Sequence, residues 1–167
     1  MKLQPGAVER FLAQPAPAIR AVLVYGPDAG LVRERADALI VVAAGSIGDP
    51  FRVASLAPAQ LTIGQLDDEA RALAFGGGRR ALVLRDAGEK AADALGRFLD
   101  EPPPGDALVV VSADDLGKRS SLRRLFEESA NGAAIACYPE DGAGREKLAR
   151  ALLADLGLTA SDDALAR

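Results

Sequence analysis

The sequence predicts a three-layer α/β sandwich with a five-stranded, mainly parallel sheet, and two observations carry this prediction. First, five short apolar runs recur along the chain, and those at 81–85 and 107–112 are nearly continuous in Val and Leu, as in strands buried on both faces. Second, segments with apolar residues at helical spacing lie between these runs. Alternating strands and helices favour a parallel sheet covered by helices on both faces.

The five strands are expected at the apolar runs, which are 21–25, 51–56, 81–85, 107–112 and 133–138. The first helix between them is expected over about 31–42. The other three helices are expected to bury Leu66, Ala70, Leu73 and Ala74, then Ala91, Leu95, Phe98 and Leu99, and finally Leu122, Leu125 and Phe126. Ser120 or Ser121 is placed to cap the N-terminus of the last helix.

The alternation of strands and helices stops after residue 139, which predicts a domain boundary near residue 140. Residues 1–140 are expected to form the α/β domain. Within 144–156 the leucines are spaced by four, which is typical of a helix, and a new N-cap pattern begins at Thr159. Residues 141–167 are therefore expected to be the truncated beginning of a helical domain.

The composition excludes several kinds of active site. The chain has no histidine and a single cysteine, so histidine-based triads, His-based zinc sites and intrachain disulfides are excluded. We predict no catalytic residues, no metal site and no cofactor, and we expect Cys137 to be a small buried hydrophobic side chain. The net charge of −4 does not favour nucleic acid as a partner of the whole domain. The apolar runs are too short to cross a membrane, and a cytoplasmic protein without membrane contact is expected.

The turn after the first expected strand has the context of a phosphate-binding loop but lacks its chemistry. The pattern GxxxxGK[ST] can be aligned with its first glycine on Gly26. Val32 then stands where a lysine would reach the phosphates, and Arg33 stands where a hydroxyl would bind Mg²⁺. We predict a tight turn around Asp28 in which Gly26 and Gly30 supply backbone freedom, with no bound nucleotide.

Acidic residues after two later strands are expected to have structural roles. Asp86 follows the third strand, where ATPases place an Mg²⁺ ligand, but its spacing to Glu89 fits a capping box for the next helix. Asp114 and Asp115 follow the fourth strand, and such a pair is typical of a helix cap or a solvated turn.

Taken together, several segments resemble one family, the delta subunit of the bacterial DNA polymerase III clamp loader, in an alphaproteobacterial-like form. The resemblance covers nearly the whole chain and rests on the order and spacing of the segments rather than on one motif. The segments are MKLQPGAVERFL, VLVYGPDAGLVRERA, DPFRV, GGRRALVLRDAGEK, PPPGDALVVVSADDLGKRSSLRRLFE and ACYPED. The resemblance implies an AAA+ type domain over 1–140, a small helical lid domain beginning at about 141, and a further C-terminal domain that contacts the other loader subunits.

The function implied by the resemblance is mechanical. Similar subunits do not hydrolyse ATP. They bind the ring-shaped sliding clamp, which is the beta subunit, and they open one interface of the ring. ATPase partners then place the ring on primed DNA. The chain is thus expected to have no activity of its own, as one component of the polymerase holoenzyme.

In this family, two adjacent large apolar residues at the end of the helix before the third strand contact the clamp. The corresponding segment here contains Leu73, Ala74, Phe75 and Arg79, and an alanine separates the leucine from the phenylalanine. Either Phe75 alone is the anchor, or Leu73 and Phe75 act together. The alternative is that Leu73 packs inward and Phe75 closes the base of the sheet. Arg79 and Arg80 are candidates for steering the segment toward an acidic clamp surface.

A second candidate contact is a basic cluster of four residues, Lys118, Arg119, Arg123 and Arg124. Its functional interpretation is a weak or indirect contact with DNA phosphates, or a contact with a neighbouring loader subunit. The alternative, which we favour, is a solvated helix face on which Glu127 and Glu128 pair with the arginines.

Two other classes of function stay open. A nucleotide-binding P-loop ATPase domain with an aberrant loop is the main alternative, and the absent lysine and hydroxyl argue against it. A Rossmann-like small-molecule domain is less consistent with the sequence, because the spacing of Gly26 and Gly30 does not match GxGxxG.

Overall fold

The structure is a computed structural model that describes residues 1–74 and 78–139. The chain divides into two units, Met1–Cys137 and Tyr138–Arg167, and the fold described below is that of the first unit. Phe75, the helix predicted at 144–156 and the remainder of 141–167 lie outside the described residues.

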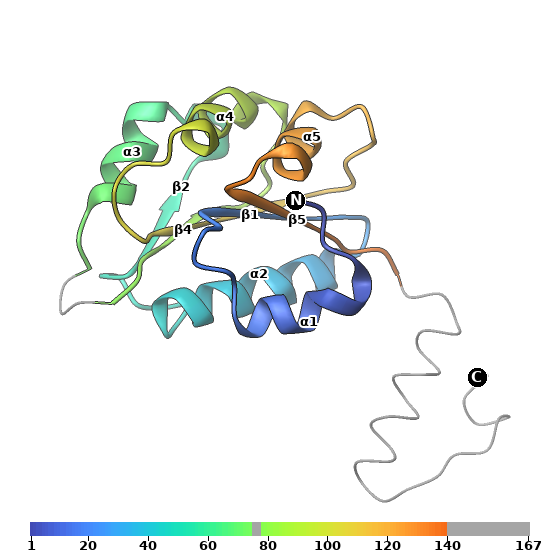
Figure 1. Ribbon diagram of the computed structural model, residues 1–167, viewed down its shortest axis with the longest axis horizontal. Helices are drawn as coiled ribbons and strands as arrows, with labels where there is room; N and C mark the ends of the chain where they lie inside the picture. The colour runs from blue at the N-terminus through green and yellow to red at the C-terminus, as the bar shows by residue number, and fades with distance from the viewer. Residues whose placement is uncertain (75–77, 140–167) are drawn as a thin grey trace, which may run out of the picture. The chain divides into compact units, whose positions relative to one another are not determined.

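An entirely parallel, five-stranded sheet forms the centre of this unit (Figure 1). Its strands are β1 (Ala21–Tyr25), β2 (Val53–Leu56), β3 (Ala81–Leu84), β4 (Leu108–Ala113) and β5 (Gly132–Ala136). Their order across the sheet is β2-β3-β4-β1-β5. Every residue of β1, β3 and β4 is buried, as their continuous apolar sequences predict. The predicted sheet is confirmed, with strand ends displaced by one or two residues.

Helices cover both faces of the sheet and complete the three layers (Figure 1). One face carries α1 (Pro5–Ala13) and α2 (Ala29–Ala44), and the other carries α3 (Ile63–Arg71), α4 (Ala92–Asp100) and α5 (Ser121–Glu128). Two 3-10 turns, η1 (Pro58–Gln60) and η2 (Glu89–Ala91), precede α3 and α4. Among the described residues, no helix combines the length and the apolar character needed to cross a membrane.

Alternate strand residues enter two separate cores, because successive side chains of a strand point to opposite faces of the sheet. In β1, Leu23 and Tyr25 join the core under α3, α4 and α5. Val22 and Val24 join the core under α1 and α2. The sheet is therefore held from both sides, and its two ends are left to carry connections.

Helix α1 is not among the helices expected from the apolar spacing, although the sequence carries signals for it. Pro5 occupies the first turn, where its missing N–H costs nothing. Val8, Phe11 and Leu12 follow at helical spacing, and all three are buried. The helix has only nine residues, so its apolar stripe is short.

Helix α3 ends earlier than its apolar spacing predicts. Its last residue is Arg71, and Ala72 has an extended backbone with φ −62° and ψ 128°. Leu73 and Ala74 therefore follow the helix instead of continuing its buried face. The expectation that Leu73 packs inward with Leu66 is wrong.

Candidate functional site

The turn after β1 requires glycine at its first position. Gly26 has a φ of +148°, and a Cβ built there would lie 2.1 Å from the carbonyl oxygen of Cys137. The backbone N–H of Asp28 donates to that same oxygen, at 3.3 Å. Gly30 lies inside α2, where a Cβ would have only an ordinary contact with the Asp28 carboxylate at 3.4 Å. The predicted need for backbone freedom thus holds at Gly26 and not at Gly30.

A carboxylate of the turn itself occupies the start of α2. The backbone N–H of Leu31 donates to Oδ1 of Asp28 at 3.0 Å, so Asp28 caps the helix. In phosphate-binding loops this helix end attracts an anion. Here the negative charge of Asp28 already lies there, which disfavours a phosphate at the same position.

Leu31, Val32 and Arg33 all depart from the phosphate-loop pattern, and the side chains of the last two point in different directions. Val32 is buried in the core under α1 and α2. The side chain of Arg33 is 80% exposed and pairs with Asp37 one turn along the helix, with 3.7 Å between Nε and Oδ2. Neither residue supplies the hydroxyl that would bind Mg²⁺.

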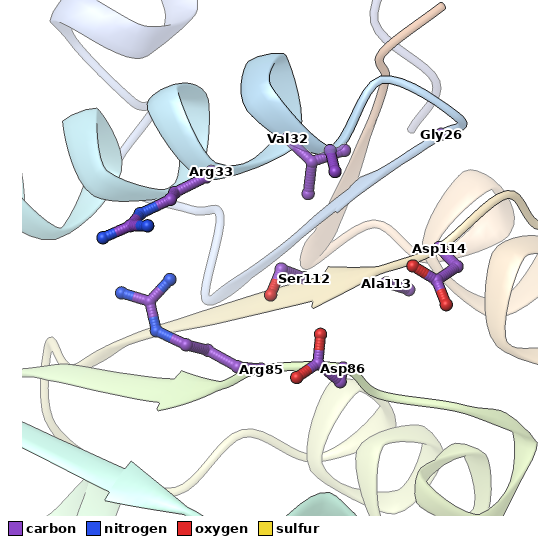
Figure 2. A pocket seen from close by; sticks show the side chains of 9 residues that line it. Gly26, Val32, Arg33, Arg85, Asp86, Ser112, Ala113 and Asp114 are labelled. Carbon is purple, nitrogen blue, oxygen red and sulfur yellow. The ribbon is translucent and has the colours of Figure 1, made fainter.

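An open cavity of about 460 Å³ lies between this turn and the ends of β3 and β4. Figure 2 shows Arg33 and Arg85 at one end of it and the carboxylates of Asp86 and Asp114 toward the other. Arg85 pairs with Asp37 at 2.9 Å, and this single carboxylate is shared with Arg33. The cavity thus combines partly neutralised arginines with two carboxylates, a poor environment for a polyphosphate.

The predicted capping box of Asp86 and Glu89 is wrong. The side chain of Glu89 extends instead to the N-terminus of α5. Its carboxylate accepts hydrogen bonds there from the hydroxyl groups of Ser120 and Ser121. It also accepts from the backbone N–H groups of Ser121 and Leu122. These hydrogen bonds, those from Ser120 and Ser121 foremost, lower the pKa of Glu89. Asp86 has a φ of 55°, and no side-chain cap is present on η2 or α4.

The predicted N-cap of α5 is confirmed at Ser120, whose hydroxyl accepts from the N–H of Arg123 at 3.1 Å. Ser120, Ser121 and Glu89 therefore hold the preceding connection and the N-terminus of α5 together. This arrangement joins the ends of β3 and β4 outside the cavity.

Behind the turn, Cys137 is buried as predicted. Burial raises the pKa of its thiol. Arg35 on α2 donates to the Ala136 carbonyl at 3.2 Å and lies 3.5 Å from the Cys137 sulfur. These contacts fix α2 against the end of β5.

The connection between α3 and β3 lies at the opposite end of the sheet and has a different character. Leu73 is 93% exposed there, more than any other large apolar side chain among the described residues. Ala74 is partly buried. The third apolar candidate, Phe75, lies outside the described residues, so the two interpretations of the anchor stay open.

Arg80 braces this connection from inside. Its side chain is 12% exposed, and Nη1 donates to the carbonyls of Glu69 and Ala72 at 2.9 and 3.5 Å. Its Nη2 pairs with the Glu69 carboxylate at 2.9 Å. Arg80 thus caps the carboxyl end of α3 at the residue before Leu73.

Arg79 is also directed toward the protein. It donates to the carbonyls of Asp106 and Ile19, the latter at 3.3 Å. Burial is the main reason that the pKa of its guanidinium is lowered. Arg79 and Arg80 thus support the connection by contacts directed toward the protein. The expectation that they steer the segment toward the clamp did not include this role, because their hydrogen-bond acceptors lie on other elements.

In the basic cluster, Arg123 is directed inward. It is 7% exposed, its guanidinium lies over the ring of Tyr25 at 5.2 Å, and it pairs with Glu127 at 2.9 Å. It also donates to the Leu116 carbonyl at 3.0 Å. A phosphate cannot reach this guanidinium without disrupting these contacts.

The remaining cluster residues, Lys118, Arg119 and Arg124, are exposed. Arg124 pairs with Glu128 at 3.6 Å. Both predicted helical ion pairs are therefore present. The solvated-face interpretation holds for Arg124 and Glu128, whereas Arg123 is buried.

Comparisons with known proteins bear on the fold. No protein-family model matches the sequence, and no curated protein matches it. Among solved structures, the chain is similar to the Bacillus subtilis DNA clamp loader delta protein, with a TM-score of 0.69 and 16% identity over 96% of this chain and 50% of that one. It is also similar to a DNA polymerase III gamma subunit-related protein from Thermotoga maritima, with a TM-score of 0.55 and 16% identity over 91% of this chain and 52% of that one.

This chain therefore spans about half the length of both structures. At such low identity the likeness concerns the fold alone, an α/β fold that this chain shares with both structures. The predicted fold class is confirmed for the described α/β unit.

Proposed function

We propose that this chain is the clamp-contacting part of a delta-type clamp-loader subunit. It binds the sliding clamp and opens one interface of the ring, so that partner ATPases load the ring on primed DNA. Support comes from the AAA+ type fold, from the similarity to a clamp loader delta protein, and from the segments on which the sequence resemblance rests. The proposed location is the cytoplasm, and the other clamp-loader subunits are proposed as further partners.

The observation that carries the proposal is the exposed Leu73 on a braced connection. Burying a leucine side chain contributes roughly 1.5–3 kcal/mol, and apolar anchors of this kind dominate many protein interfaces. Because Arg80 holds the preceding residues, little ordering is required when Leu73 is buried by a partner. Phe75, two residues on, is proposed as the second part of this anchor.

The mechanism needs no bond chemistry from this chain. The anchor favours whichever ring conformation, closed or open, has the pocket that it fits best. It can shift the equilibrium between these two conformations only by the difference in its affinity for them. ATP hydrolysis is assigned to partner subunits, consistent with the missing lysine and hydroxyl at Val32 and Arg33. Any DNA contact by Lys118, Arg119 or Arg124 is weak or indirect.

The test is calorimetric binding to the sliding clamp of the same organism. Leu73→Ala and Phe75→Ala are compared with wild type and with Val41→Ala, an exposed apolar control on α2. We expect wild type and the control to bind equally. Loss of about tenfold in Leu73→Ala is 1.4 kcal/mol and would identify the anchor. A folded wild-type chain that does not bind the clamp would overturn the proposal.

The nucleotide-binding alternative is tested by titration with ATP and Mg²⁺. The cavity beside Gly26 is large enough to make this measurement worthwhile. We expect no binding at micromolar ATP, because Asp28, Asp86 and Asp114 place negative charge around the position of the phosphates. Micromolar affinity would restore the alternative.

A further inference from the structure

A second large apolar side chain is exposed at the same end of the sheet as Leu73. Phe51 is 62% exposed and lies in the connection between α2 and β2, and Ile47 in the same connection is exposed too. Strands β2 and β3 are parallel neighbours, with Val53 opposite Ala81. The connections that precede them therefore reach the same edge of the sheet (Figure 1).

The backbone that carries Phe51 is held by a side chain. Oδ1 of Asp49 accepts from the N–H groups of Phe51 and Arg52 at 2.9 and 3.2 Å. The Asp49 carbonyl accepts from the N–H of Val53 at 2.9 Å. This Asx turn fixes the position of Phe51 before any partner arrives, which lowers the ordering cost of binding.

The turn is tied directly to the connection that carries Leu73. The Arg52 carbonyl accepts from the N–H of Ala81 at 2.8 Å. The Arg52 guanidinium lies against Gly78, where an added Cβ would be 3.2 Å from Nη1. Gly78 has a φ of +91°, so glycine serves both the backbone conformation and this close approach.

A clamp contact centred on Leu73 must extend beyond the connection between α3 and β3, because specific interfaces are large. Such interfaces bury about 800 Å² on each partner, far more than one short connection offers. On the β4 side, the neighbouring connection contains Pro102, Pro103 and Pro104, and no large apolar side chain of its described residues is exposed. On the β2 side, the neighbouring connection exposes two large apolar side chains, Phe51 and Ile47.

We infer that the turn at 47–52 is a second part of the clamp-binding surface, with Phe51 as an apolar anchor beside Leu73. This inference rests on the proposed function and adds a second contact on a different connection. The partner is the same clamp, because the Arg52 side chain lies against Gly78 and so places the turn beside the connection that carries Leu73.

The experiment measures clamp affinity for Phe51→Ala, Phe51→Leu, Leu73→Ala and the control Val41→Ala, with melting temperatures for all. Because Phe51 is 62% exposed, its substitution is expected to lower the melting temperature only slightly. We expect Phe51→Ala to weaken binding roughly fivefold to tenfold, Phe51→Leu about threefold, and Val41→Ala not at all.

The outcomes separate the two proposals. If Leu73→Ala weakens binding while Phe51→Ala and Phe51→Leu bind like wild type, the second anchor is refuted and the proposed function stands. If folded wild type does not bind the clamp, the proposed function fails and the second anchor fails with it. Should Phe51→Ala not fold, Phe51→Leu decides alone, and wild-type affinity in that variant refutes the inference.

Discussion

The two ends of the sheet use polar residues in opposite ways. At the carboxyl ends of the strands, Asp28 caps the local helix and Arg85 pairs with Asp37, so charged groups largely satisfy one another beside an open cavity. At the amino ends, Arg80 and Arg52 hold connections from which Leu73 and Phe51 extend into solvent. The comparison supports placing the proposed clamp-binding surface at the amino ends of the strands, and not at the turn after β1.

The largest effect is expected from a change at the carboxyl end. Gly26→Ala places a Cβ within 2.1 Å of the Cys137 carbonyl oxygen, at a φ that alanine rarely adopts. We expect the free energy of unfolding to fall by about 3 kcal/mol or more, measured by urea denaturation. The matched control is Gly30→Ala, which should be neutral or slightly stabilising because the site is helical. Equal effects of the two substitutions would contradict the account of this turn.

A smaller effect is expected at the amino end. Arg80→Ala removes the hydrogen bonds to Glu69 and Ala72 and leaves these groups without their partner. We expect a loss of about 2 kcal/mol in the free energy of unfolding, together with weaker clamp binding. The control is Arg97, an exposed arginine that belongs to a different ion pair. Arg97→Ala should change the free energy of unfolding by less than about 0.5 kcal/mol. A stable Arg80→Ala variant with wild-type binding would show that the brace is unnecessary.

The smallest effect concerns the glutamate that links the ends of β3 and β4. Glu89→Gln weakens the hydrogen bonds that Glu89 accepts at the start of α5, and a loss of about 1 kcal/mol at pH 7 is expected, as for a helix cap. The folded pKa of Glu89 is lowered, so its contribution is complete above its ordinary value of 4.5. That contribution disappears as the pH falls through the lowered pKa.

Denaturation curves of wild type and Glu89→Gln from pH 7 to pH 3 test this dependence. The difference between the two proteins should stay constant above pH about 5 and shrink below it. A difference that persists unchanged to pH 3 would mean that the charge of Glu89 does not stabilise α5.

Much of the fold could be predicted from the sequence because buried strands and helical stripes leave a regular pattern. The departure from the phosphate-loop pattern is also evident in the sequence, since it depends on the residue types at Val32 and Arg33. The exposure of Leu73 could not be predicted from the sequence. Its spacing from Leu66 fits the buried face of a helix, and no glycine or proline marks the end of α3 at Arg71.

The supporting roles of charged residues were also hidden from sequence patterns. Asp86 and Glu89 have the spacing of a capping box, yet the partners of Glu89 are 31 residues or more away in the chain. The acceptors of the Arg80 side chain similarly lie on α3, the helix that precedes β3 in the chain. Such contacts follow from the packing of distant segments, which local spacing does not encode.

The central claim is that a partner binds the amino end of the sheet and leaves the carboxyl end untouched. Hydrogen exchange of this chain with and without the sliding clamp tests it most directly, by comparing peptides that cover 45–52 and 72–80 with those that cover 26–33. The account predicts slower exchange in the first two segments and no change in the third. Protection confined to 26–33, or no protection in either connection at saturating clamp, would contradict it.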